Sequence, residues 1–255
     1  MTSKITPIFL IIGFLISFNN LLFCQVNIKD SAIGMSIVSV HYSAQLPGGD
    51  LAQRFGWNSN LGISYFYKTK TNYLYGITAS YLFGGAPIET DIMSNIITPQ
   101  GYIIGSNGEY ADVVLYERGL NIMANFGKMF HSKTPNPNSG LYLLGGIGFL
   151  QHQVFIEDVG KNVPEIDGNY SKGYDRLTNG PAISQTLGYM YFSNKHLINF
   201  YVNVEFTEAI TKERRALDFD TMKAENNLRT DILYGISVGW SLPLYKKAPN
   251  KFYYY

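Results

Sequence analysis

Residues 229–242 read RTDILYGISVGWSL, and this stretch decides the fold. Every second residue is apolar from Ile232 to Leu242, which is the period of a β-strand. The alternate positions hold small uncharged residues such as Gly235, Ser237 and Gly239. A sheet surface that faces water normally carries charge. A small, polar, uncharged face fits the narrow lumen of a barrel instead, so the pattern predicts a transmembrane β-barrel whose apolar face points outwards.

The composition favours the same interpretation. Charged residues make up only 15% of the 255-residue chain, whereas a soluble domain carries roughly a quarter. The 20 Tyr and 16 Phe suit the aromatic girdles that flank the apolar band of an outer-membrane barrel. A net charge of +1 argues against nucleic acid as a partner.

Residues 1–24 have the pattern of a signal peptide, with Lys4 before an apolar stretch that ends near Cys24. We therefore expect residues 25–255 to form the barrel, with long extracellular loops and a short periplasmic tail at the C-terminus. A lipoprotein signal acylated at Cys24 is an alternative, although Phe23 is bulkier than such signals prefer. A retained membrane helix is another, but Asn19 and Asn20 interrupt the run.

Eight later segments alternate over a length that suits a tilted barrel strand. They are residues 31–44, 57–68, 73–84, 118–129, 140–154, 181–192, 197–209 and 229–242. Their connections alternate between short, as at residues 69–72, and long, as at residues 85–117. Outer-membrane barrels have short periplasmic turns and longer extracellular loops. The sequence thus predicts an all-β, eight-stranded, antiparallel up-and-down transmembrane barrel in the outer membrane with both termini periplasmic. In the first strand, a change of phase near Val38 predicts a bulge.

A polar network is expected inside the barrel along the seventh strand. Its members are Asn199, Tyr201, Asn203, Glu205 and Thr207. A buried carboxylate needs a cation or several donors, so Glu205 is expected to form a salt bridge near the outer mouth with Arg229, Arg176 or Arg54. A proton or ion path past Glu205 is the alternative. Side chains just about fill an eight-stranded barrel, and inward glycines such as Gly146 and Gly148 beside larger groups such as Tyr201 predict a plugged lumen.

Catalytic candidates are few. Barrel enzymes of the outer membrane place His beside Ser, Asp or Glu at the outer rim. His131 and His196 fall in predicted periplasmic turns, which leaves His41, with Ser43 nearby, and His152, with Glu157 nearby, towards outer strand ends. No metal-ligand spacing or cofactor loop is present, so we predict no catalytic residue, no metal and no cofactor.

The predicted loops carry most of the charge. Residues 212–215 include the pair Arg214 and Arg215, which is a candidate docking surface for lipopolysaccharide or a partner protein. Apolar Ile96, Ile97 and the segment 102–104 in the second long loop predict a hairpin above the membrane.

Residues 199–207, 49–56 and the Arg214–Arg215 pair resemble a pattern in small outer-membrane barrels of Bacteroidota. That group includes accessory barrels of the barrel-assembly and type IX secretion machineries. The resemblance implies a non-enzymatic protein that binds other outer-membrane proteins. The tail 246–255 departs from the usual ending of outer-membrane barrels and is expected to contact a periplasmic partner. Asp30–Ala32 and Asp220–Met222 resemble the three-residue O-glycosylation pattern of that phylum. Three alternatives remain: a small-solute or ion channel, a rim enzyme that modifies lipid, and a secreted lipocalin-like barrel whose large apolar faces would point inwards.

Overall fold

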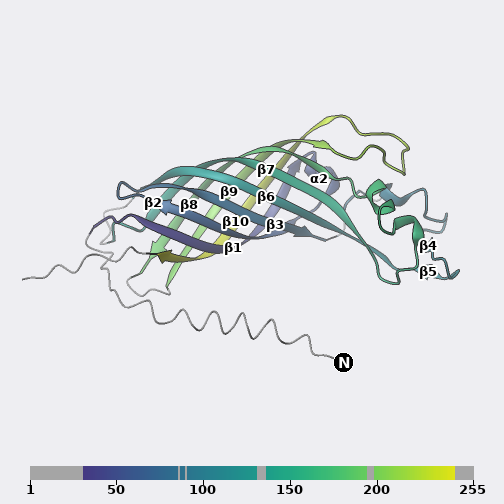
Figure 1. The fold of residues 1–255 in the computed structure, drawn as a ribbon, viewed down its shortest axis with the longest axis horizontal. Helices are drawn as coiled ribbons and strands as arrows, with labels where there is room; N and C mark the ends of the chain where they lie inside the picture. The colour runs from purple at the N-terminus through teal and green to yellow at the C-terminus, as the bar shows by residue number, and fades with distance from the viewer. Residues whose placement is uncertain (1–30, 86, 90, 131–135, 194–197, 245–255) are drawn as a thin grey trace, which may run out of the picture.

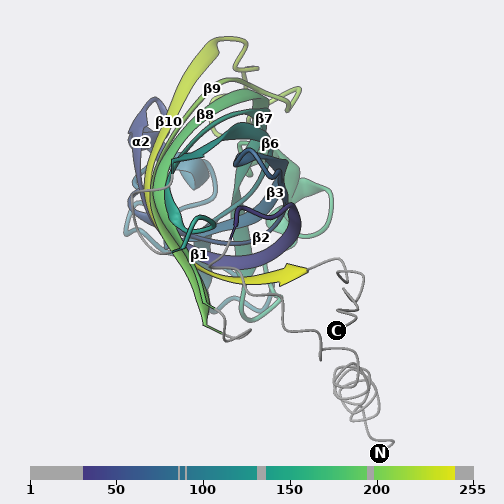
Figure 2. The ribbon, with the colours of Figure 1, turned by 90° about the vertical axis from the view of Figure 1, so that its left-hand side faces the viewer.

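Eight antiparallel strands close into a single barrel in the computed structural model, which describes residues 31–85, 87–89, 91–130, 136–193 and 198–244 (Figure 1). The order around the ring is β1, β10, β9, β8, β7, β6, β3, β2, and the first and last strands pair to complete it (Figure 2). The strands are β1 (Met35–Gly49), β2 (Asn58–Lys68), β3 (Tyr73–Gly84), β6 (Val113–Phe130), β7 (Gly140–Asp158), β8 (Thr178–Phe192), β9 (Asn199–Glu213) and β10 (Leu228–Leu244). The predicted fold class is confirmed.

The connections sort by length as expected. Short turns follow β2, β6 and β8 at one end of the barrel, which we call the short-turn end. The opposite, long-loop end carries α2 (Leu51–Arg54), the hairpin of β4 (Ile103–Ile104) and β5 (Tyr110–Ala111), and three 3-10 turns (Figure 1). Those turns are η2 (Asp91–Met93), η3 (Pro164–Ile166) and η4 (Tyr170–Gly173). The predicted hairpin of the second long loop is therefore present, at β4 and β5.

The apolar faces point outwards, which excludes the lipocalin-like alternative. On β10, Tyr234, Ile236, Val238 and Trp240 are exposed while Ser237 and Ser241 are buried. The same sorting holds on β2, where Leu61 and Ile63 are exposed and Asn60 and Ser64 are buried. This is the arrangement predicted from the sequence, since an outward apolar wall suits a lipid environment.

The strands extend further than predicted at the long-loop end. β6 and β7 have 18 and 19 residues, whereas a tilted membrane strand needs only about 10. The additional residues continue the sheet beyond the apolar wall, where outward positions such as Gln151 and Gln153 on β7 are polar. Apolar and polar residues no longer alternate there, so the sequence predicted strand ends that lie before the observed ones.

The predicted bulge near Val38 is wrong. β1 pairs without interruption with β10 and with β2 through this point, and Val38 opposes Leu242 and Tyr65. Met35 and Ile37 face inwards, and both are buried. The change of phase marks the place where the lumen itself becomes apolar, near the short-turn end, rather than a break in the ladder.

The predicted signal at residues 1–24 and the tail at 246–255 lie outside the described residues, as do Asp30, His131 and His196.

Candidate functional site

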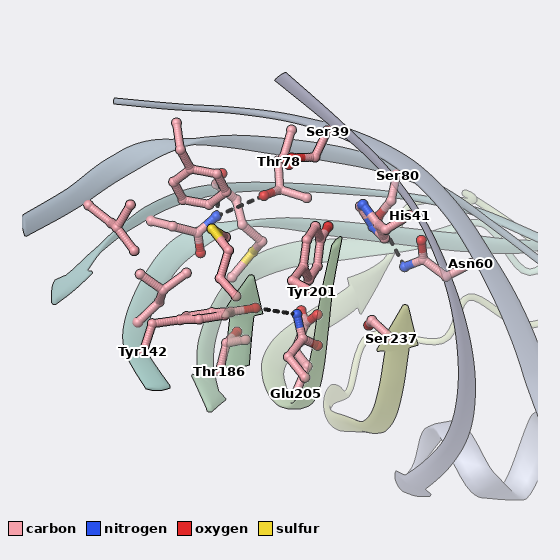
Figure 3. A pocket seen from close by; sticks show the side chains of 18 of the residues that line it. Ser39, His41, Asn60, Thr78, Ser80, Tyr142, Thr186, Tyr201, Glu205 and Ser237 are labelled. Carbon is pink, nitrogen blue, oxygen red and sulfur yellow. Dashed lines mark hydrogen bonds between the residues drawn. The ribbon is translucent and has the colours of Figure 1, made fainter. Parts of the chain in front are cut away.

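A polar cavity of about 40 Å³ lies inside the barrel (Figure 3). Its walls come from β1, β2, β3, β6, β7, β8, β9 and β10, so the whole ring contributes. The polar groups around it are mainly hydroxyls and amides, with His41 on β1 and Glu205 on β9 as the titratable exceptions. A water molecule needs roughly 10–15 Å³ of such space. The cavity can therefore hold a few water molecules and is too small for a metabolite.

Several hydrogen bonds run along the lumen wall between nearby strands and fix these side chains. Asn60 donates from Nδ2 to Ser80 Oγ at 3.0 Å, and Asn125 donates to Thr78 Oγ1 at 3.0 Å. Asn203 donates to the hydroxyl oxygen of Tyr142 at 2.9 Å (Figure 3). Each of these bonds joins different strands, so the lumen is a cross-linked network.

Other polar atoms face the cavity without a hydrogen-bond partner among the described residues. They are His41 Nδ1, Asn60 Oδ1, Asn121 Oδ1 and Asn203 Oδ1. Buried polar groups cost free energy unless they are hydrogen-bonded, and internal water commonly satisfies them. Water molecules in the cavity can form hydrogen bonds with these atoms.

The structure places the five predicted lumen residues at different heights along β9. Tyr201, Asn203 and Glu205 line the cavity, and Thr207 donates to Glu205 Oε1 at 3.2 Å. Asn199 lies apart at the short-turn end, where its Oδ1 accepts a hydrogen bond from the backbone N–H of Ser193. The sequence placed these residues on one face correctly but could not give their heights in the barrel.

The predicted salt bridge of Glu205 is wrong. Among the described residues no cation pairs with it, and Glu205 lies midway along β9, opposite Gly235 and Thr186. The three arginines proposed as partners lie closer to the long-loop end and pair with other carboxylates. Glu205 is therefore a carboxylate inside the lumen, and its side chain accepts a hydrogen bond from Thr207.

Two glycines make room for the tyrosines of the lumen. A Cβ on Gly239 would lie 2.3 Å from the ring of Tyr201, and one on Gly188 would lie 2.7 Å from Tyr142. Glycines thus lie opposite large lumen side chains, as predicted, although the glycines are not the ones that were named. Gly146 and Gly148, however, face Asn125 and Met123 rather than Tyr201.

Apolar side chains close the lumen on both sides of the cavity. Towards the short-turn end, Met35, Ile37, Phe66, Leu74, Met129, Met190 and Phe192 form one buried cluster. Towards the long-loop end, Leu82, Met123, Leu150, Ala182, Ala209 and Leu233 form part of a second, which continues into the loops through Leu51 and Phe55. A hydrated ion would have to cross both layers, so this arrangement opposes conduction.

The long-loop end is covered by a network of charges that sequence reasoning did not identify. Arg54 lies at its centre and contacts Glu89 at 3.0 Å, Glu225 at 3.4 Å and Glu213 at 3.8 Å. It also donates to the carbonyl oxygen of Arg176 and to Thr178 Oγ1. One side chain from the first long loop thus joins the other three, and we call this assembly the loop cap.

Arg176 and Arg229 complete the loop cap. Arg176 lies 2.6 Å from both Asp218 and Asp220, and Arg229 lies 3.2 Å from Glu225. Burial acts to lower the pKa of Arg176, but Asp218, Asp220 and Glu89 outweigh it and hold the pKa above its ordinary value. The guanidinium group therefore remains charged although it is buried.

The two candidate histidines occupy different environments. His41 was expected towards an outer strand end, but it lies midway along β1 in the lumen cavity. His152 lies beside an acid, with Nε2 2.9 Å from Asp231 Oδ2, and both side chains are buried under the loop cap. Phe55 packs edge-on against the His152 ring. The acid beside His152 is therefore Asp231 and not Glu157, the acid nearby in sequence, and His152 does not line an open cleft.

Arg214 and Arg215, the candidate docking pair, differ in their contacts. Arg215 donates to both carboxylate oxygens of Asp175, and these hydrogen bonds raise the pKa of Arg215. Arg214 stays exposed while it contacts Asn179. The two arginines therefore do not form one free surface.

The ring order and the closed lumen invite comparison with solved structures. Neisserial surface protein A aligns with 81% of this chain and 96% of its own, at 11% identity and a TM-score of 0.42. Ail, the attachment invasion locus protein of Yersinia pestis, aligns with 82% of this chain and 99% of its own, at 10% identity and a TM-score of 0.40. Both are distant matches, and the closed ring of eight antiparallel strands is established by the strand pairing of this chain itself.

The N-terminal β-barrel domain of Pseudomonas aeruginosa OprF gives a third match, at 12% identity and a TM-score of 0.37, covering 82% of this chain and 99% of that domain. No family model matches the chain, and no curated protein does. The resemblance to barrels of Bacteroidota stays a prediction.

Proposed function

We propose that this protein is a non-enzymatic integral protein of the outer membrane that serves as a structural or accessory subunit of an outer-membrane assembly. The observation that carries the proposal is the lumen, which apolar layers close on both sides of a cavity large enough only for water. A barrel closed in this way acts through its surfaces. The outward apolar wall supports the membrane location, with the long-loop end extracellular and the termini periplasmic.

The loop cap supports a binding role at the extracellular end. Its charge network holds four loops together, and the hairpin of β4 and β5 presents Tyr102 stacked on Tyr110 with ring centroids 4.5 Å apart. Both rings are more than half exposed. Exposed aromatic residues are enriched where proteins bind one another. We propose that this hairpin contacts a partner protein, while exposed Arg214 is available to a lipopolysaccharide phosphate.

The channel alternative is weaker because it requires a continuous wet path past Glu205, and apolar layers lie on both sides of that residue. The rim-enzyme alternative requires a His and an acid facing a cleft. His152 and Asp231 instead lie beneath Phe55 and the loop cap.

The test is purification of the tagged full-length protein from outer membranes in mild detergent, followed by sizing and mass spectrometry. Recovery with one larger assembly in fixed stoichiometry supports the accessory role. Tyr110→Ser should weaken that association, whereas Asn107→Ser on the same hairpin removes no aromatic ring and should not. Recovery of the barrel alone, together with ion conductance in planar bilayers, would favour the channel instead.

A further inference from the structure

Three cations lie on the outward face of the barrel without a carboxylate partner. They are Arg118 on β6, Lys212 on β9 and Arg214, which directly follows β9. Each follows a buried, inward residue in the chain, so its side chain points away from the lumen. No carboxylate of the described residues lies within ion-pairing distance of any of them, whereas every other arginine of the chain forms an ion pair.

These cations lie where the apolar wall ends on its long-loop side. On β6 the exposed Leu120 is the outward residue next to Arg118, and on β9 the exposed Ile210 is the outward residue next to Lys212. On β7 and β8, between these strands, the first outward residues past the wall are uncharged amides. We use the name basic row for the outward residues Arg118, Gln151, Gln153, Asn179, Lys212 and Arg214.

The strand register makes the basic row continuous across four neighbouring strands. Asn179 on β8 opposes Gln151 on β7 and Lys212 on β9, and Arg118 on β6 opposes Gln153 on β7. Hydrocarbon surrounds the apolar band of a membrane barrel, and the interface begins at the edge of that band. The basic row therefore lies at the depth of the lipid headgroups on the long-loop side.

Contacts within the protein hold two of the cations in place. Arg214 reaches back along the barrel, where its Nε donates to Asn179 Oδ1 at 2.7 Å and its Nη2 donates to the Asn179 carbonyl oxygen at 3.3 Å. Because Asn179 opposes Lys212, the Arg214 guanidinium is held beside that lysine. The Arg118 guanidinium lies 5.0 Å from the ring centroid of Tyr116 and 5.7 Å from that of Phe155.

Two carboxylates share this outward face but do not neutralise the basic row. Glu208 lies on β9, four residues from Lys212 towards the short-turn end, and Glu157 lies on β7, four residues beyond Gln153. Four residues of strand span roughly 13 Å. Neither carboxylate forms an ion pair within the described part of the chain. The row thus keeps an excess of positive charge.

We propose that the basic row binds the phosphate groups of lipid headgroups in the membrane leaflet at the long-loop end. Guanidinium groups bind phosphate through charge-assisted, often bidentate hydrogen bonds, and the amides between the cations can donate to further phosphate oxygens. A lipid can place its acyl chains on the apolar wall while its phosphate reaches the row, whereas a free phosphate ion makes no use of the wall. The inference rests on the proposed membrane location and is independent of the accessory role.

Calorimetric titration of the full-length protein in dodecyl maltoside micelles tests the site, with dihexanoyl phosphatidic acid as the probe. The wild-type protein should bind this lipid, and the affinity should fall as the ionic strength rises. Lys212→Gln combined with Arg214→Gln should weaken binding by about tenfold or more. The matched control combines Lys172→Gln with Lys223→Gln, which removes the same charge from exposed lysines of the long loops and should leave the affinity unchanged.

Titration with inorganic phosphate separates a lipid site from a site for the free ion. Inorganic phosphate that binds as tightly as the lipid overturns the proposal, as does equal weakening by the two double variants. A wild-type protein that inserts into vesicles yet binds no phosphatidic acid also overturns it, and leaves the membrane location and the accessory role standing. Failure of the wild-type protein to insert into vesicles would instead contradict the proposed membrane location.

Discussion

Arg54 and Glu225 are 171 residues apart in the chain, and their side chains meet at 3.4 Å over the mouth of the barrel. Arg54 follows β1 and Glu225 precedes β10, so this contact joins the loops beside the strands that close the ring. The same guanidinium group reaches Glu89 and Thr178. The first long loop is thereby fixed to the other three.

Replacing Arg54 should loosen the loop cap. Arg54→Ala leaves Glu89, Glu213 and Glu225 without this cation, and breaking a buried ion pair from one side typically costs about 3–5 kcal/mol. We expect faster hydrogen exchange in residues 85–112 and 214–227 and a lower thermal midpoint. Arg214→Ala, which removes an exposed arginine, should change stability by less than about 1 kcal/mol. Equal effects of the two variants would contradict the central place of Arg54.

Glu205→Gln should stabilise the barrel. No cation in the described part of the chain pairs with this carboxylate, so a neutral amide of similar shape removes the cost of burying a charge. We expect a gain of about 1–2 kcal/mol in the free energy of unfolding, measured by urea titration in lipid vesicles at neutral pH. A loss of stability would show that Glu205 does have a charged partner.

Gly239→Ala should destabilise the barrel because its Cβ would lie 2.3 Å from the Tyr201 ring. Overpacking of this kind costs about 1–3 kcal/mol. Gly145→Ala provides the control, since nothing lies within 4 Å of its Cβ. Unfolding in urea should separate the two variants. If Gly239→Ala is as stable as Gly145→Ala, the ring of Tyr201 does not lie against Gly239.

The loop cap should open in acid. Burial acts to raise the pKa of Glu225, but Glu213, Arg229 and Arg54 outweigh burial and hold that pKa below the ordinary value of 4.5. A depressed pKa means that the carboxylate stabilises the folded cap at higher pH and that this contribution is lost as the pH falls through the folded value. Hydrogen exchange in residues 214–227, corrected for the intrinsic pH dependence, should therefore increase below pH 4.5.

Glu225→Gln should remove this pH step while leaving the rest of the barrel protected. An unchanged step in that variant would contradict the assignment of the opening to Glu225.

The alternation of apolar and polar residues predicted most of the fold, because the outer wall of the barrel repeats the same apolar surface along each strand. Alternation located the eight barrel strands, since most outward residues of the wall meet the same apolar surroundings. It failed where that repetition ends. Outward positions beyond the wall, such as Gln151 and Lys212, carry no apolar signal, so the strand ends were predicted too early.

The loop cap and the lumen were less predictable because their contacts span long separations. The partners of Arg54 follow from how four loops converge, and no local spacing encodes this. A general rule on buried carboxylates predicted a cation beside Glu205. In the structure Glu205 lies midway along β9, whereas the three proposed arginines lie nearer the long-loop end.

The pairing of β1 with β10 has a consequence for biogenesis. Ser39 Oγ and Ser241 Oγ meet at 2.9 Å across this seam, although they are 202 residues apart. The ring therefore cannot close until the last strand has been synthesised, and until then both edge strands keep unpaired backbone groups. Contacts between residues far apart in sequence, such as those between β1 and β10, also form slowly during folding. Insertion should thus be completed only after synthesis, when the edges of β1 and β10 can meet.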